Sequence, residues 1–433
     1  MPIERNTLVT SRTSAAPPST RADESGHRPR RRTTGAPQVS HGVGFWFAAI
    51  SFAVLMAFGT APVPLWPLYE QRDGFGATTV TVAFAILVVG ASAGFVVLGH
   101  LSDHLGRRRV VVPALGVALV AALVLAFWTD LAGLLAGRLL NGVAIGLMAS
   151  TATAYLHDLY RQEHPDRARS RLPGLVATTA NLGGLALGPL IAGMIARWAP
   201  HPLTVTQVGF AAAMALCLVM AVSTPETVDR RAGAARPRRF ALRPGAGALF
   251  GSASALGFFS FALFGLVSSL GAIILRSSLG ISSPLVAGVA PFAMFIASAV
   301  AQLVLGRFGA AATAAVGTIA FPLGLGLAAL SLYEPALWLF LLAVSVAGAG
   351  AGALFKTGIT RAGESAVDSS RAGVLAVYFV AGYVGMGLPS ILFSLVVKHV
   401  AVGPAMIGFS AVLSAGAVIA VTLAQRTGSH SNR

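Results

Sequence analysis

Long apolar segments alternate with short polar stretches along most of the chain. Each segment holds about 20 residues or more, which is the length a helix needs to cross the hydrocarbon core of a bilayer. Three prolines, Pro62, Pro64 and Pro67, are expected to break the outer half of the first segment, because proline lacks the backbone N–H of a continuing helix. The pattern predicts an all-α membrane protein with twelve spans, at 44–69, 77–99, 110–128, 131–156, 172–196, 203–223, 247–275, 284–306, 310–332, 335–357, 372–397 and 402–424.

One long polar stretch interrupts this pattern, at residues 224–246. Six predicted spans precede it and six follow it. We therefore expect an N-terminal six-helix bundle at 42–223, a linker, and a C-terminal six-helix bundle at 247–425. Residues 1–41 are polar and rich in Arg, Pro and Ser, so they are expected to form a disordered basic tail without the apolar core of a signal peptide. A short tail, 426–433, ends the chain.

Composition supports a membrane protein. The chain is 55% apolar and 11% charged, whereas roughly a quarter of the residues are charged in a soluble domain. A net charge of +16 raises the alternative of nucleic-acid binding, but the arginines are spread over the connections between apolar segments, so no nucleic-acid partner is expected. The single cysteine, Cys217, lies in an apolar segment and excludes a disulfide within the chain.

No pattern typical of a cofactor or an enzyme occurs. The chain has no Gly-x-x-x-x-Gly-Lys-Ser/Thr sequence, so ATP is not expected to drive it directly. No His and acid cluster has the spacing of a metal site, so no metal or cofactor is expected. A membrane enzyme would need paired acids, His or Ser and Lys groups at one depth, and the spans show none.

The Lys and Arg residues are distributed unevenly between the two sides of the predicted spans. With the N-terminus in the cytoplasm, 26 of the 31 lie on the cytoplasmic side. Four lie outside, Arg72, Arg197, Arg276 and Lys398, and Arg138 lies within a span. Because positive residues favour the cytoplasmic side, both termini are expected there, in a protein of the plasma (inner) membrane.

The most charged short connection is GHLSDHLGRRR at 99–109, between the second and third spans. Lipid hydrocarbon cannot solvate it, so it must lie at a membrane surface, and three consecutive arginines indicate the cytoplasmic one. A plain connection could use Gly, Ser or Asn alone. The charge pattern therefore suggests a further role for Gly99, Asp103, Gly106, Arg107, Arg108 and Arg109.

This pattern resembles the signature loop of major facilitator superfamily transporters, and the resemblance covers roughly residues 42–426. It implies a fold of twelve helices in two pseudo-symmetric six-helix bundles. It also implies a gating role for the loop, with Asp103 near Arg107 and the N-terminal end of the eleventh span. His104 stands where the family usually has Arg or Lys. The alternative is an ordinary positively charged cytoplasmic loop.

The two halves repeat weakly, as expected for such a fold. Gly142-x-x-x-Gly146 in the span at 131–156 recurs as Gly348-x-x-x-Gly352 in the span at 335–357. Parallel repeats of six spans are typical of this transporter architecture.

A Gly- and Pro-containing motif lies in the span at 172–196. Small residues permit close helix approach in membranes, and proline kinks a helix. The sequence resembles the antiporter motif of drug-efflux members of the superfamily, although Ala192 replaces one glycine. Ordinary small-residue packing is the alternative. The motif positions are Gly184, Gly188, Pro189 and Gly193.

Arg138 lies seven residues into the span at 131–156, about 10 Å below its outer end. A cation at this depth is unfavourable by at least a few kcal/mol, which makes a functional role the first expectation. Arg138, Asn141 and Gly142 resemble the family motif in which the arginine takes part in proton coupling. The alternative is an arginine that extends outward to lipid headgroups.

The acidic residues do not identify a proton carrier. None of the 15 Asp and Glu residues lies in the middle of a predicted span. Glu70, Asp130 and Asp158 remain candidates, or plain interfacial charges. The substrate cavity is therefore expected to suit neutral or amphiphilic molecules. Besides Asn141, the polar or aromatic residues that could line it are Thr60, Trp66, Asn181, Ser260, Gln302, Tyr378 and Tyr383.

These features favour a secondary active transporter, working as a monomer in the lipid bilayer, that exports a small organic molecule in exchange for protons by alternating access. Uptake or uniport by the same fold is the first alternative. A transporter-like sensor or scaffold would usually carry an added soluble domain, and the connections are too short to contain one.

Overall fold

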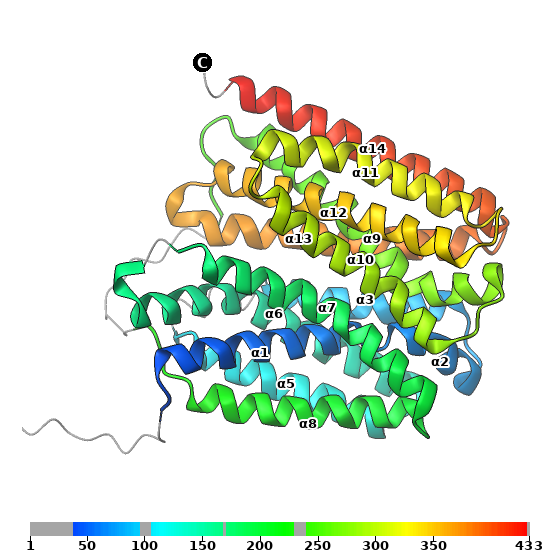
Figure 1. Ribbon diagram of the computed structural model, residues 1–433, viewed down its shortest axis with the longest axis horizontal. Helices are drawn as coiled ribbons and strands as arrows, with labels where there is room; N and C mark the ends of the chain where they lie inside the picture. The colour runs from blue at the N-terminus through cyan, green and yellow to red at the C-terminus, as the bar shows by residue number, and fades with distance from the viewer. Residues whose placement is uncertain (1–37, 96–104, 168–169, 229–239, 431–433) are drawn as a thin grey trace, which may run out of the picture. The chain divides into compact units, whose positions relative to one another are not determined.

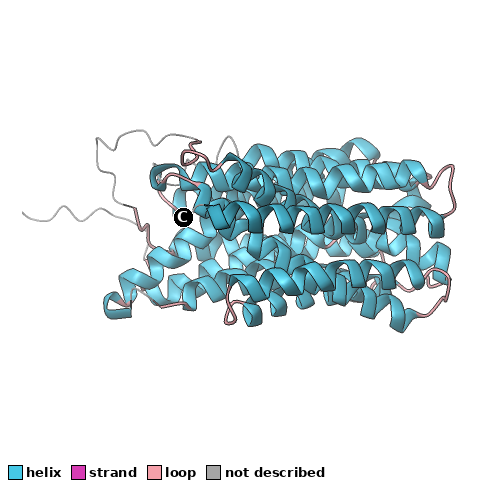
Figure 2. Cartoon of the chain, turned by 90° about the horizontal axis from the view of Figure 1, so that it is seen from above, coloured by secondary structure: helices cyan, strands magenta, loops and turns pink. Residues whose placement is uncertain are grey.

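The computed structural model describes residues 38–95, 105–167, 170–228 and 240–430. These residues form one compact unit that is almost entirely helical (Figures 1 and 2). Within the described ranges, extended pairing is limited to one isolated bridge, between Leu242 and Ala366. The expected all-α fold is confirmed.

The described residues of the N-terminal half form seven α-helices and two 3₁₀ turns, of which the turn η3 (Pro165–Arg167) follows α6. The others are α1 (His41–Thr60), the 3₁₀ turn η1 (Val63–Leu65), α2 (Trp66–Asp73), α3 (Ala77–Ala93), α5 (Arg108–Phe127), α6 (Leu131–Glu163), α7 (Leu172–Trp198) and α8 (Pro202–Ser223).

The C-terminal half contains six long helices. They are α9 (Gly247–Leu279), α10 (Pro284–Leu305), α11 (Ala310–Leu330), α12 (Leu337–Ser365), α13 (Arg371–Val396) and α14 (Val402–His430). In Figure 1 this half lies above the N-terminal half, and its helices run from green to red.

Eleven helices of the described ranges are long and apolar enough to cross a membrane, with α1 to α2 counted as one. The shorter apolar helix α3 stops just before the undescribed residues 96–104. These helices agree with a twelve-span integral membrane protein.

Several helix ends differ from the predicted spans. The first span is broken by its prolines into α1, η1 and α2, as expected. However, α6 continues to Glu163 and α12 to Ser365, beyond the predicted ends at 156 and 357. Hydropathy detects only the apolar part of a helix, whereas backbone hydrogen bonding continues into polar turns. Lys356, which lies next to the predicted end at 357, is therefore well inside α12, and Arg138 is not the only basic residue well inside a described helix.

Lys356 has a structural partner at this position. Its Nζ atom donates to the carbonyl oxygen of Gln302 at 2.9 Å, near the C-terminal end of α10. The last carbonyls of a helix lack intrahelical donors, and a cation is favourable there.

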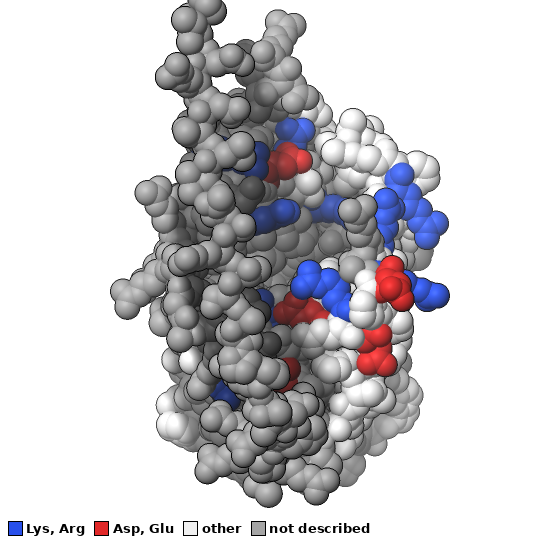
Figure 3. Space-filling model, turned by 90° about the vertical axis from the view of Figure 1, so that its left-hand side faces the viewer, with Lys and Arg blue, Asp and Glu red and all other residues white. Residues whose placement is uncertain are grey.

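The two ends of the helix bundle differ in charge. The end that carries residues 105–109, 224–228 and 365–371 is called the arginine-rich end. The end that carries residues 61–76 and 279–284 is called the opposite end. Figure 3 views the arginine-rich end and shows many Lys and Arg side chains there, with a smaller number of acidic ones among them.

The two halves are joined at the opposite end. Trp66 Nε1 donates to the carbonyl oxygen of Ser268 on α9 at 3.0 Å, and Glu70 forms an ion pair with Arg276 at 2.8 Å. Also across the halves, α10 packs against α7 (Figure 1), and α13 packs against α3. The bundle is therefore closed at the opposite end.

Candidate functional site

Arg138 is completely buried in the N-terminal half and does not extend to the surface. Its Nη1 atom donates to the carbonyl oxygen of Gly59 at 3.1 Å. Its guanidinium carbon lies 5.5 Å from the ring centre of Trp66 and 5.8 Å from that of Phe84. The headgroup alternative is therefore wrong for this conformation.

The break after α1 explains part of this arrangement. In an unbroken helix, the carbonyl of Phe58 would accept from residue 62, but Pro62 has no N–H. Asn141 Nδ2 lies 3.5 Å from that carbonyl oxygen, and Arg138 binds the next carbonyl, that of Gly59. Polar side chains of α6 thus take the place of missing helix donors.

Gly142, the third residue of this motif, packs against α3. A Cβ atom added there would lie 2.0 Å from the carbonyl oxygen of Leu87, so only glycine permits this approach. The motif on α6 therefore joins α6 to α1 by hydrogen bonds and to α3 by backbone contact.

The motif on α7 contacts two different helices. Gly184 and Gly188 lie against α1, where added Cβ atoms would approach the carbonyl oxygens of Ala53 and Ala57 to 2.3 and 2.0 Å. Gly193 lies against α10, where an added Cβ would be 2.7 Å from the carbonyl oxygen of Pro284. The first half of the motif thus holds the N-terminal bundle together, and the second half contacts the C-terminal bundle.

Pro189, also in this motif, leaves a carbonyl without its usual donor. The carbonyl of Leu185 lies four residues before it and would bind an N–H that proline lacks. The hydroxyl of Thr60 donates to this carbonyl at 2.9 Å. Thr60 therefore forms a hydrogen bond that joins α1 to α7, whereas sequence analysis expected this residue to face a cavity.

The charged loop contacts the first residues of the linker. Gly106 has a φ of 108°, a conformation that favours glycine. Glu226 accepts from the backbone N–H of Arg107 at 2.7 Å and from that of Arg109 at 3.4 Å, at the N-terminus of α5. A carboxylate is favourable at this position because the first N–H groups of a helix have no partner within the helix and carry a partial positive charge.

Side chains of the same loop also bind within the N-terminal half. Arg107 forms an ion pair with Asp158 at 3.2 Å, and Arg108 donates to the carbonyl oxygen of Thr224 at 3.2 Å. Gly99 and Asp103 lie outside the described residues. The expected contact of Asp103 with the start of the eleventh span therefore stays a prediction.

The three acids considered as proton carriers have partners. Glu70 binds Arg276, and Asp158 binds Arg107. Asp130 precedes α6 and accepts from the N–H of Gly133 at 2.8 Å, a bond that lowers the pKa of this exposed carboxylate.

Aromatic side chains from both halves form a contiguous group, which we call the aromatic cluster. It comprises Phe95, which lies just after α3, and Phe261, Phe355, Tyr378, Phe379 and Tyr383 from α9, α12 and α13. The rings of Phe95 and Phe379, one from each half, are stacked with their centres 4.9 Å apart.

Within this cluster, the Tyr378 hydroxyl donates to the carbonyl oxygen of Phe355 at 3.1 Å. The ring centre of Tyr383 lies 5.7 Å from that of Phe95 and 5.5 Å from that of Phe261. Sequence analysis selected the two tyrosines for their hydroxyls. It missed the phenylalanines because the same residue type also faces lipid, and one sequence does not distinguish the faces of a helix.

The other expected cavity residues do not gather in one place. Ser260 is buried and donates to Leu256 of its own helix at 2.7 Å. The amide of Gln302 lies 3.5 Å from the Ser298 hydroxyl, and Asn181 is half-buried on α7. Only Trp66, beside Arg138, and the two tyrosines of the aromatic cluster join larger groups.

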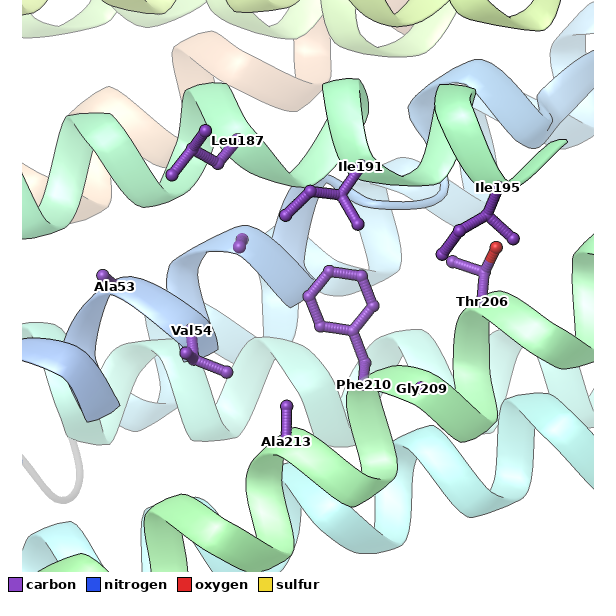
Figure 4. Close-up of a pocket in the computed structure, with 10 residues that line it drawn as sticks. Ala53, Val54, Leu187, Ile191, Ile195, Thr206, Gly209, Phe210 and Ala213 are labelled. Carbon is purple, nitrogen blue, oxygen red and sulfur yellow. The ribbon is translucent and has the colours of Figure 1, made fainter. Parts of the chain in front are cut away.

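A groove of about 320 Å³ lies on the N-terminal half between α1, α7 and α8 (Figure 4). Leu187, Ile191 and Ile195 of α7 form one wall, and Phe210 of α8 faces them. All of its lining residues belong to one half, and none was expected to line the cavity. The groove is therefore separate from the contacts between the halves.

Comparisons with known proteins identify relatives among transporters. A bacillibactin exporter of Bacillus subtilis is 26% identical over 157 residues, 35% of this chain and 38% of the exporter. The glucose transporter GlcP of Staphylococcus epidermidis is 39% identical over 98 residues, 22% of each chain. The chain thus spans well under half the length of either relative.

Comparison of structures agrees on the fold. A solved structure of a POT family transporter in complex with 5-aminolevulinic acid superposes with a TM-score of 0.72 at 13% identity, covering 90% of this chain and 98% of that one. The family profile of the Major Facilitator Superfamily matches residues 45–388, most of the chain. With its helical fold and its transporter relatives, the chain belongs to the Major Facilitator Superfamily.

Proposed function

We propose that this protein exports a small organic molecule in exchange for protons, by alternating access between its two halves. Family membership makes it an integral membrane transporter rather than an enzyme. Export, proton coupling and the kind of substrate are the proposal. Its support comes from α7, the relatives and the arrangement of charges.

The contact between α7 and α10 is the observation on which the proposal rests. Gly193 approaches the backbone of Pro284, and Gly288 approaches that of Pro189, where an added Cβ would lie 2.3 Å from the carbonyl oxygen. Two helices from different halves thus approach each other through their backbones at these glycines. Such a contact can separate and re-form as the halves move, and it lies on the motif that resembles that of antiporters.

The relatives support transport in either direction. One is named an exporter and another a glucose transporter. The resemblance of the α7 motif to efflux members favours export for this chain. Uptake or uniport is the second candidate, and its support is the 39% identity to the glucose transporter over 98 residues.

We further propose that the arginine-rich end is cytoplasmic, in a monomer at the plasma (inner) membrane with both termini inside. The charge asymmetry supports this orientation. In this arrangement the bundles 42–223 and 247–425 are the moving units, and the loop with Asp103 closes the cytoplasmic side. The aromatic cluster, which joins both halves, suits neutral or amphiphilic molecules with an apolar or aromatic part.

Growth of an efflux-deficient host on a panel of toxic compounds, with and without the gene, would test export. Protection that disappears with a protonophore is expected. Increased toxicity or accumulation of one compound in cells that express the gene would instead favour uptake. Proton movement in inverted vesicles on addition of the protective compound would then test exchange.

Arg138 provides a sharper test of coupling. Arg138→Lys keeps the charge but loses the planar group of five donors, and Arg138→Ala loses both. Both variants are expected to reach the membrane and to lose uphill, protonophore-sensitive transport, while Arg138→Ala keeps some downhill exchange. Full coupling in Arg138→Ala, at an expression level equal to that of wild type, would show that the arginine is structural.

A further inference from the structure

The buried guanidinium of Arg138 is only partly satisfied. Nη1 binds Gly59, but Nε and Nη2 have no hydrogen-bond partner. A guanidinium stays protonated in proteins, so its charge must be balanced where it is buried. Two aromatic rings and one carbonyl oxygen partly stabilise the guanidinium, but none of the three carries a full negative charge.

No carboxylate of the neighbouring described helix ends is available to balance this charge. Glu70 pairs with Arg276 at 2.8 Å, and Asp73 pairs with Arg72 at 2.6 Å. Asp130 is exposed and caps α6. The acids closest along the chain to Arg138 and Trp66 are thus engaged elsewhere.

Two further buried polar side chains, Tyr69 and Gln207, lie in the same part of the N-terminal half. The Tyr69 hydroxyl and the Gln207 amide are buried beside each other, and neither has a hydrogen-bond partner among the other described residues. Tyr69 lies beside Gln207 and within electrostatic range of Arg138. A cation, a hydroxyl and an amide can all donate hydrogen bonds to one anionic group.

We propose that Arg138, with Tyr69 and Gln207, binds a single anionic group, either chloride or the carboxylate of a transported molecule. Such a group would balance the buried charge and use the free donors Nε and Nη2. The proposal goes beyond proton exchange, and it rests on the proposed function only in assuming that the opposite end opens. A carboxylate ligand would make the substrate an anionic amphiphile.

Trp66 controls access to this site. Its ring covers Arg138, and its indole N–H is bound to Ser268 on α9, in the other half. The ion pair between Glu70 and Arg276 holds α2 against the same helix. When α9 moves away at the opposite end, Trp66 loses its acceptor and can uncover the guanidinium. The anion therefore enters from the opposite end, and only in the open state.

Thermal unfolding of the purified full-length protein in detergent tests this site without a gradient or a transport assay. The probes are sodium chloride and sodium benzoate, each compared with buffer without the added salt, in wild type and in Arg138→Gln. A ligand that binds only the folded state raises the unfolding midpoint. We expect an upward shift for wild type with chloride or benzoate, and no shift for Arg138→Gln.

Two milder variants keep the test valid if Arg138→Gln does not fold. Tyr69→Phe removes only a hydroxyl, and Gln207→Leu removes only the amide. Each is expected to bind the anion roughly tenfold more weakly, because a hydrogen bond to a charged group is lost. Arg197→Gln, which changes an exposed arginine at the same end, is the matched control and should keep the full shift.

A shift with chloride alone would identify an inorganic ion, and a shift with benzoate alone would identify a substrate carboxylate. Glu70→Gln weakens closure of the opposite end and should increase the apparent affinity for the anion. An unchanged midpoint for wild type with both chloride and benzoate, or equal shifts in wild type and Arg138→Gln, would overturn the proposal. A protein that binds the anion but exports nothing would instead contradict only the proposed function.

Discussion

At the scale of single residues, prolines and the polar side chains near them explain much of the N-terminal half. Pro62 and Pro189 each remove a helix donor. Asn141 lies at the carbonyl left by the first, and Thr60 binds the carbonyl left by the second. The sequence shows these residues, and Arg138 could be selected from its depth alone. The pairings could not be predicted, because they depend on which helices are neighbours.

Thr60→Val should lower the free energy of unfolding by about 1–2 kcal/mol, because it leaves the partly buried carbonyl of Leu185 without a donor. Valine has a similar shape, so the change is mainly the loss of the hydroxyl. Thr178→Val is the matched control, since the Thr178 hydroxyl bonds to Gly174 one turn back on its own helix. Denaturant unfolding in detergent measures both. Equal losses in the two variants would contradict the role assigned to Thr60.

At the scale of helices, the positions of the spans could be predicted but several of their ends could not. Apolar length decides where a helix crosses the bilayer, and it identified every long helix described. Extension of α6 and α12 into polar turns depends on hydrogen bonds and tertiary contacts, for example those of Arg107 with Asp158 near the end of α6. Likewise, the glycines of α7 could be identified, but their different partners required the structure.

The two kinds of glycine on α7 lead to a direct test. At Gly193 an added Cβ would be 2.7 Å from a backbone oxygen of α10, whereas at Gly183 nothing lies within 4 Å. Gly193→Ala should therefore hinder closure of the opposite end and reduce the transport rate several-fold, and Gly183→Ala should leave it near that of wild type. Initial rates at matched expression measure the difference. Unchanged transport in Gly193→Ala would show that this contact does not limit the cycle.

At the scale of the whole molecule, charged side chains attach the linker to the two halves. The linker is anchored at both ends, by Glu226 on the charged loop and by Arg243, whose Nε donates to the carbonyl of Ala366 at 3.0 Å. Each end of the linker thus stays with its own half, so the halves can move without releasing it. Sequence analysis identified the linker from its polarity, but not these two attachments, because they depend on tertiary contacts.

Orientation can be tested independently of transport. A reporter fused after residue 240 should lie in the cytoplasm, and one fused near residue 200 should lie outside, because the arginine-rich end is expected to be cytoplasmic. A pair of reporters active on opposite sides of the membrane, one suited to each compartment, makes the measurement. Both fusions on one side would contradict the twelve-span topology, and an exchange of sides would reverse the orientation.

Movement of the halves can be tested where α3 meets α13. The Thr81 and Ser394 hydroxyl oxygens lie 3.1 Å apart, one in each half. Cysteines at these positions, in a protein whose single buried Cys217 is changed to Ala, can reach each other to form a disulfide. Oxidation should fix the opposite end in its closed state, because a covalent bond then joins the two halves.

Transport by Thr81→Cys/Ser394→Cys should consequently fall to the level of cells without the gene after oxidation, and should recover after reduction. The two single-cysteine variants are the controls and should not respond to the oxidant. Gel mobility after proteolysis between the halves, with and without reductant, measures how much protein is cross-linked. If nearly all of the protein is cross-linked and still transports at the wild-type rate, separation of α3 from α13 at this position is not part of the cycle. If cross-linking stops transport, the closed opposite end seen in the structure is one of the two states between which the transporter alternates.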